Sequence, residues 1–129
     1  MAADVVRVVL ADDSRDLREL LRLRLERDPR FVVVGEAGDG ERAVALVREH
    51  QPEIAVLDLG MPVLDGAEAL AQIRLHAPAT RVAVLSGTGR QDLRDERVLD
   101  ADLHLDKSGS LEDIVTAIRG LAVMPEPHA

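Results

Sequence analysis

The sequence contains no cysteine, tryptophan or tyrosine, and Phe31 is its one aromatic residue. Without cysteine there can be no disulfide, no thiolate nucleophile and no zinc–thiolate site. Without a set of aromatic side chains there is no stacking platform for single-stranded nucleic acid. No apolar run approaches the roughly 20 residues that cross a bilayer, and no basic stretch precedes the apolar run near the N-terminus. We therefore expect no membrane span, no secretory signal and a cytoplasmic location.

Basic residues are also few relative to acidic ones. Sixteen Lys and Arg residues face 24 Asp and Glu residues, which gives a formal net charge of −8. This surplus argues against direct binding to nucleic-acid phosphates. Fifteen of the basic residues are arginine and one, Lys107, is lysine. Because the lysine ammonium is a compact point charge and the guanidinium is a flat fork, Lys107 is a candidate for a site that needs the first shape.

The length and composition indicate one globular domain. The chain has 129 residues, of which 47% are hydrophobic and 31% charged, and a chain of this size buries a single core. We assign residues 1–122 to this domain and residues 123–129 to a short tail after the last helical pattern.

Short β-like runs alternate with longer helical ones. Strands are predicted over residues 5–11, 31–37, 53–58, 81–86 and 102–106. Helical spacing of apolar residues lies between the strands. One helix is predicted after Ser14 and another after Ser110, both interpreted as N-caps; two more end before Pro52 and Pro78, and a weaker helix is predicted over 91–100. This alternation predicts an α/β fold, a doubly wound sheet of five parallel strands with helices on both faces. Gly35, Gly38 and Gly40 are interpreted as turn residues.

Polar side chains stand at the carboxyl ends of the predicted strands. Asp12 and Asp13 follow the first, Asp58 ends the third, Ser86 ends the fourth, and Lys107 follows the fifth. Ligands of open parallel sheets bind beyond these ends. Clustered carboxylates need a cation to stay ionised, and oxygen ligands suit Mg²⁺, which also accepts phosphate oxygens. A carboxylate beside Mg²⁺ can take up a phosphoryl group as an aspartyl phosphate, with an ammonium and a hydroxyl on the phosphoryl oxygens.

Four segments resemble the receiver domains of two-component response regulators. They are VVRVVLADD, VLDLGMPVLDG, VAVLSG and LDKSGSLEDIVTAI, and the Asp followed by Met-Pro and then Asp-Gly is the most specific pattern. The run FVVVGEAGDGERAVALV resembles the NarL/FixJ-type subfamily, whose members usually carry a helix-turn-helix output domain. The resemblance implies a flavodoxin-like sheet of strand order 2-1-3-4-5.

The resemblance also implies a role for each site residue. Asp58 is the implied phosphoacceptor, and Lys107 and Ser86 act with it on the phosphoryl group. The implied Mg²⁺ ligands are Asp12, Asp13, Asp58 and the Gly60 carbonyl. Ser86 and His104 are the implied switch residues. The implied partners are a histidine kinase or phosphotransfer protein and an output domain or downstream protein, and the sequence leaves a homodimer open.

The sequence departs from the family pattern around its last strand. Asp100-Ala101-Asp102 replaces a turn of small residues, Asp106 stands next to the lysine where an apolar residue is common, and Ser108 replaces a frequent proline. Asp106 either pairs with Lys107 or faces solvent. The arginines of the first predicted helix, Arg15, Arg18, Arg22 and Arg24, are interpreted as a solvated face that pairs with nearby acids.

Two other functions share features with this sequence. A phosphatase of the haloacid-dehalogenase type also forms an aspartyl phosphate but carries a second Asp two residues after the nucleophile, where this chain has Gly60. We therefore expect a self-phosphorylating receiver rather than a turnover enzyme. The other alternative is a degenerate receiver that works as a phosphorylation-independent protein-binding scaffold, which the altered residues 91–102 suggest.

Overall fold

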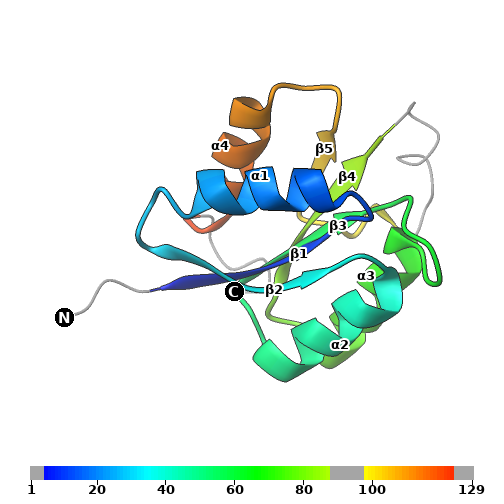
Figure 1. The fold of residues 1–129 in the computed structure, drawn as a ribbon. Helices are drawn as coiled ribbons and strands as arrows, with labels where there is room; N and C mark the ends of the chain where they lie inside the picture. The colour runs from blue at the N-terminus through cyan, green and yellow to red at the C-terminus, as the bar shows by residue number, and fades with distance from the viewer. Residues whose placement is uncertain (1–4, 88–97, 124–129) are drawn as a thin grey trace.

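In the computed structural model, which describes residues 5–87 and 98–123, five parallel strands form one sheet between two layers of helices (Figure 1). The strands are β1 (Val6–Ala11), β2 (Phe31–Ala37), β3 (Ile54–Asp58), β4 (Arg81–Ser86) and β5 (Leu103–Asp106). The helices are α1 (Arg15–Leu25), α2 (Gly40–His50), α3 (Gly66–His76) and α4 (Leu111–Leu121). The strand order is β2-β1-β3-β4-β5 and every pairing is parallel. The predicted fold class and sheet order are confirmed.

Two predictions for the later half of the chain are not tested by the described residues. The helix predicted over 91–100 falls mostly on residues 88–97, which lie outside the described residues. The boundary between domain and tail at residues 122 and 123 stays a prediction. In the ranges that the structure covers, no helix is both long and apolar enough to span a membrane.

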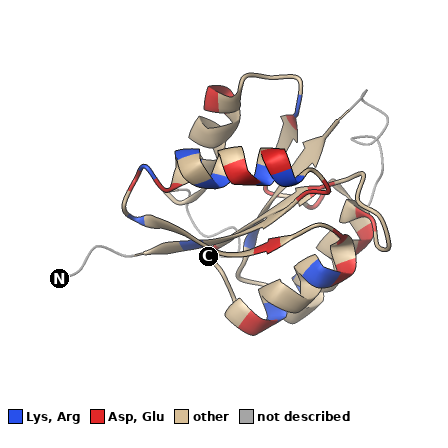
Figure 2. Cartoon of the chain, in the orientation of Figure 1, with Lys and Arg blue, Asp and Glu red and all other residues tan. Residues whose placement is uncertain are grey.

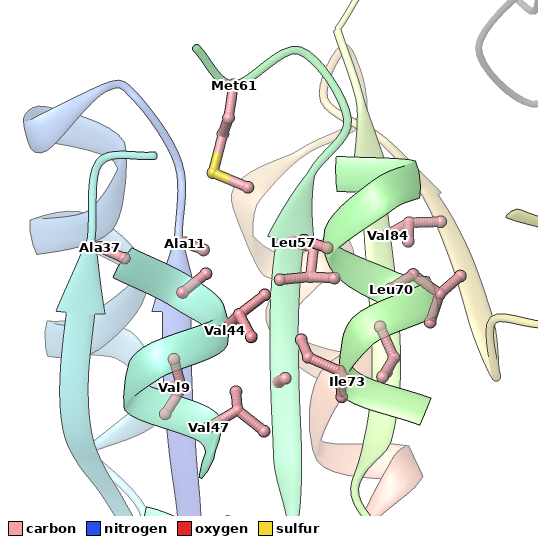
Figure 3. Packing of buried hydrophobic residues seen from close by; sticks show 14 of the residues in the cluster. Val9, Ala11, Ala37, Val44, Val47, Leu57, Met61, Leu70, Ile73 and Val84 are labelled. Atoms are coloured by element: carbon pink, nitrogen blue, oxygen red, sulfur yellow. The ribbon is translucent and has the colours of Figure 1, made fainter. Parts of the chain in front are cut away.

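Alternate residues of the strands build two separate hydrophobic cores, which are aliphatic apart from Phe31 and Met61. Val9 and Leu57 face one side of the sheet, where they pack with Val44 of α2 and Leu70 of α3 (Figure 3). Neighbouring strand residues face the other side and pack against α1 and α4; this cluster includes Val8, Leu10, Leu21, Leu25, Ile114 and Ile118. Because both faces of the sheet are covered, its central strands are nearly continuously apolar between their ends.

Each described helix begins at a residue whose side chain accepts a main-chain hydrogen bond. Ser14, Asp39, Asp65 and Ser110 are the N-caps, and each accepts from the N–H three residues ahead. The caps predicted at Ser14 and Ser110 are therefore confirmed. Such caps replace a missing helical partner. The cap at Ser14 fixes the start of α1 shortly after the end of β1, and the cap at Asp65 fixes the start of α3 at the end of the loop that follows β3.

Arginine residues occur along the whole of α1, with acidic residues between them in its first half (Figure 2). Arg22 pairs with Glu36 of β2 at 3.2 Å, and Arg24 pairs with Glu112 of α4. The interpretation of a solvated, acid-paired face suits these two residues. Arg18 also pairs with an acid, Glu36, but the expected solvation is wrong for it, because its side chain is only 16% exposed and contacts main chain as well. Spacing along a helix cannot show this difference, because it depends on what the neighbouring loops place beside each arginine.

Candidate functional site

The parallel sheet brings four strand ends together around one ammonium group. Lys107, directly after β5, has its Nζ 2.8 Å from Asp12 Oδ2 and 3.0 Å from Asp58 Oδ2. Carboxylate oxygens of Asp12, Asp13 and Asp58 all lie within 4.8 Å of one another. Ser86 ends β4, between β3 and β5 in the sheet, and its carbonyl accepts the Lys107 main-chain N–H at 2.9 Å.

Burial differs sharply between these residues. Asp12, Asp58 and Ser86 are 1%, 4% and 3% exposed, whereas Asp13 is exposed. Burial raises the pKa of the Asp12 carboxyl, and this outweighs the opposing contacts with Lys107 and the Ser14 N–H. Burial alone would lower the pKa of Lys107, but its contacts with Asp12 and Asp58 outweigh that effect and raise it. The lysine is therefore positively charged at neutral pH, whereas ionisation of Asp12 costs free energy because the carboxylate is buried.

Main-chain donors orient the two buried carboxylates. The Ser14 N–H donates to Asp12 Oδ1 at 2.8 Å, and the Gly60 N–H donates to Asp58 Oδ1 at 3.0 Å. In each carboxylate the other oxygen, Oδ2, is the one beside Lys107. The loops after β1 and β3 thus hold one oxygen of each carboxylate in place, and the other oxygen of each carboxylate lies at the centre of the site.

The acid cluster fits a hard divalent cation. In the part of the chain that the structure describes, Asp12 Oδ2 is buried and has no donor in a favourable hydrogen-bond direction, while the Lys107 ammonium stands beside it as an ion pair. An acceptor without a hydrogen bond is costly in a buried place. Together with the exposed Asp13 and with Asp58, this oxygen makes a set of oxygen donors of the kind that Mg²⁺ takes along with water.

His104 lies apart from the acid cluster in what the structure records. It is exposed on β5, in register with Val84, and its ring Nε2 lies 2.7 Å from the Val98 carbonyl oxygen. No contact between His104 and Asp58 is recorded in the described residues, so the switch role of His104 stays a prediction. The contact instead joins β5 to the short segment that precedes it.

The loop after β3 contains a strained turn. Val63 has a φ of 68°, and the Leu64 N–H donates to the Pro62 carbonyl at 2.7 Å. This is the geometry of a γ-turn with its central residue in a region that β-branched residues rarely occupy. The buried side chain of Met61 points from this loop toward the core (Figure 3). The Met-Pro pattern therefore anchors a tight turn directly after Asp58.

Two residues that support the site were missed by the sequence reasoning. Gly66 begins α3 against the main chain of Asp58, so closely that a Cβ there would lie 2.5 Å from the Asp58 carbonyl oxygen. Arg18 donates a hydrogen bond to the Asp12 carbonyl. Gly66 is the glycine of the Asp-Gly pattern, so the family resemblance pointed to this position without giving a physical reason for the glycine. No sequence signal pointed to Arg18, because it looks like any arginine on an amphipathic helix.

The acidic departures near β5 have structural partners. The Asp106 carboxylate accepts the Ser108 N–H at 2.8 Å, so it holds the turn after Lys107, and it is exposed. Asp102 Oδ2 accepts the Val82 N–H at 2.7 Å and pairs with Arg74 at 2.9 Å. None of the described peptide bonds is cis. These acids fasten the ends of β4 and β5.

Neutralising Asp12 should stabilise the metal-free protein. A carboxyl whose pKa is higher in the folded than in the unfolded chain opposes folding when it is ionised, so Asp12→Asn should raise the free energy of unfolding at neutral pH by on the order of 1 kcal/mol. As pH falls through the raised pKa, the wild-type carboxyl takes up a proton and the gain should shrink. Urea unfolding with a chelator, at neutral and acidic pH, measures both effects.

The neighbouring acid provides the matched control. Asp13 belongs to the same cluster but is exposed, so Asp13→Asn should change the stability less than Asp12→Asn. An Asp12→Asn protein that is less stable than wild type at neutral pH would show that the Lys107 contact, not burial, dominates at Asp12.

Comparisons with known proteins agree on one family. A family model described as the response regulator receiver domain matches residues 8–119. The chain is 39% identical over 107 residues to protein-glutamate methylesterase/protein-glutamine glutaminase 3 of Myxococcus xanthus, covering 83% of this chain. It is 32% identical over 123 residues to the uncharacterized transcriptional regulatory protein YxjL of Bacillus subtilis, covering 95%. A LuxR-family two-component response regulator from Aurantimonas sp. SI85-9A1 aligns with a TM-score of 0.83 and 32% identity over 97% of this chain and 92% of that one.

The relatives also correct one expectation. The prediction that the chain is not an enzyme is contradicted, because several matching relatives are named protein-glutamate methylesterases. Gly60 in place of a second Asp bears on turnover at Asp58 and not on an activity carried elsewhere in a longer protein. The chain spans 28% of the Myxococcus xanthus relative and 56% of the Bacillus subtilis one. The sheet order, the family model and the relatives support one conclusion, which is that this chain belongs to the response regulator receiver domain family.

Proposed function

We propose that this receiver accepts a phosphoryl group on Asp58 and that the modified surface then changes its binding to a partner. The observation that carries the proposal is the buried Asp58 carboxylate held between the Gly60 N–H and the Lys107 ammonium, with two further acids beside it. A histidine kinase or phosphotransfer protein is the proposed donor. The cytoplasm remains the predicted location.

The proposed cofactor is Mg²⁺. Receiver domains generally bind this ion at an acidic pocket, and here Asp12, Asp13 and Asp58, with the Gly60 carbonyl, would hold it. When bound, it neutralises charge on the carboxylates and on the phosphoryl oxygens. The buried Asp12 carboxylate, with an oxygen within 4.8 Å of those of Asp13 and Asp58, supports this assignment.

The proposed chemical step is a simple displacement at phosphorus. An Asp58 carboxylate oxygen attacks the phosphorus of the donor and forms a new O–P bond. The bond from phosphorus to the donor nitrogen or acyl oxygen breaks, and its electron pair leaves with the donor. Lys107 is already charged and lies 3.0 Å from Asp58 Oδ2. Its ammonium then moves its contact from that carboxylate oxygen to an oxygen of the phosphoryl group.

The proposed consequence is a change of surface. The phosphoryl group adds negative charge and hydrogen-bond acceptors, and the Ser86 hydroxyl and the His104 ring are the proposed groups that respond. The target is an output domain or a downstream protein, and a second copy of the chain is a further candidate partner. The names of the relatives suggest an output that is enzymatic or gene-regulatory.

A phosphoryl mimic tests the switch. We expect beryllofluoride with Mg²⁺ to shift the NMR amide signals of Gly60, Ser86 and Lys107 in wild type, and to leave Asp58→Asn unchanged because the acceptor carboxylate is missing. A wild-type spectrum without any change would contradict the proposal. That result would favour the phosphorylation-independent scaffold, with residues 91–102 as the place to search for its partner.

A further inference from the structure

Arg18 joins three parts of the molecule at the edge of the site. Its Nη1 donates to the Asp12 main-chain carbonyl at 2.5 Å, and its Nε pairs with Glu36 of β2 at 3.3 Å. The guanidinium also packs over the turn after β2, since a Cβ built on Gly38 would lie 3.5 Å from Nη1. With 16% of its side chain exposed, Arg18 is among the less solvated arginines of the described chain.

The hydrogen bond from Arg18 completes the fixing of Asp12. The Asp12 N–H donates to the Ala37 carbonyl at 3.0 Å, and Asp12 Oδ1 accepts from the Ser14 N–H. The Asp12 carbonyl is the remaining main-chain group, and Arg18 holds it. This carbonyl belongs to the peptide bond that joins Asp12 to Asp13. Rotation of that peptide plane would swing the Asp13 carboxylate relative to Asp12.

We infer that Arg18 is a positioning residue for the metal site, one that sets the relative orientation of the Asp12 and Asp13 carboxylates through the peptide between them. Arg18 touches neither carboxylate in any recorded contact, so it acts on the ion through main chain. Partners that orient metal ligands typically affect metal affinity by about 10- to 100-fold. The inference rests on the proposed function, because it assumes that these acids hold Mg²⁺.

Arg22 offers a control with a shared partner. It pairs with the other oxygen of Glu36 at 3.2 Å, and its side chain is 41% exposed. Both arginines therefore connect α1 to β2 through Glu36, but Arg18 is the one recorded on the Asp12 carbonyl. A role confined to joining α1 and β2 would be disturbed by either substitution, whereas positioning of the acids would be disturbed by loss of Arg18.

Calorimetric titration with Mg²⁺ on the full chain tests the inference. We expect Arg18→Met to raise the dissociation constant for Mg²⁺ about tenfold, and Arg22→Met to leave it within about twofold of wild type, as suits an exposed ion pair. Amide NMR spectra establish that each variant is folded. If Arg18→Met does not fold, Arg18→Lys replaces it, since it keeps the charge but loses the fork that reaches both Asp12 and Glu36; weaker Mg²⁺ binding is expected there too.

The outcomes separate the inference from the function. Wild-type binding with an unaffected Arg18 variant overturns the inference and leaves the proposed function in place. Equal weakening in the Arg18 and Arg22 variants also overturns it, because the shared link through Glu36 would then explain the loss. A wild-type chain that binds no Mg²⁺ contradicts the proposed function itself and the inference with it.

Discussion

Lys107→Met should slow phosphorylation of Asp58 by about 100-fold or more, the usual loss when one donor aimed at developing transition-state charge is removed. In the structure the ammonium is the cation that both buried carboxylates face, at 2.8 Å from Asp12 and 3.0 Å from Asp58. Without it, the incoming phosphoryl oxygens lose their nearest positive side chain. The rate of adduct formation with acetyl phosphate, followed by intact-protein mass spectrometry at saturating Mg²⁺, measures the effect.

Lys107→Arg separates charge from shape in the same experiment. It keeps a positive charge opposite Asp12 and Asp58, so it should fold in the absence of metal, where the methionine variant leaves two buried acids without their partner. A flat guanidinium does not reproduce a point charge that lies about equally close to two oxygens. We expect a slow rate in both variants, and a methionine variant as fast as wild type would contradict the role assigned to Lys107.

Gly66→Ala should lower the free energy of unfolding by about 3 kcal/mol, the upper range for overpacking a close-packed region. A Cβ at this position would lie 2.5 Å from the Asp58 carbonyl oxygen and 2.7 Å from Leu59 Cα. Both are main-chain atoms, which cannot rotate away as a side chain can. Either α3 or the end of β3 must therefore shift, and a shift of β3 would move Asp58 itself. Urea unfolding followed by circular dichroism measures the loss.

Gly120→Ala is the matched control for that substitution. Gly120 also lies in a helix, α4, but a Cβ there would meet no heavy atom within 4 Å. Alanine at an unobstructed helical position should raise the free energy of unfolding by about 0.5–1 kcal/mol. Opposite signs for the two substitutions are expected. A Gly66→Ala protein as stable as wild type would show that the close approach of α3 to Asp58 is not needed.

The sheet and the central acids could be predicted because their signals are local and repeated. Apolar runs such as 54–58 and 81–86 indicate buried parallel strands directly, and their ends locate the ligand edge of the sheet by a general rule. Asp58 and Lys107 stand at those ends, so their meeting follows from topology. Ser110 was identified as a cap from its position before an apolar stripe, which is again a local pattern.

Features that depend on close approach between distant segments could not be predicted. Gly35, interpreted as a turn residue, lies within β2, where the register with β1 shifts beside Val34 and a Cβ built on Gly35 would lie 3.1 Å from the Leu46 side chain. Gly40, also interpreted as a turn residue, instead begins α2, where the Leu64 main-chain carbonyl lies against it. Glycine is needed at position 40 because main chain lies against it, whereas at position 35 the Leu46 side chain would have to move by a few tenths of an ångström. One sequence does not show which segment lies close to either residue.

The measurement that tests the central claim most directly is intact-protein mass spectrometry after incubation with acetyl phosphate, with and without Mg²⁺, on wild type and Asp58→Ala. We predict that wild type gains a single phosphoryl group only when Mg²⁺ is present and that Asp58→Ala gains none. A wild-type protein that stays unmodified, or an adduct that persists in Asp58→Ala, would contradict the assignment of Asp58 as the phosphoryl acceptor.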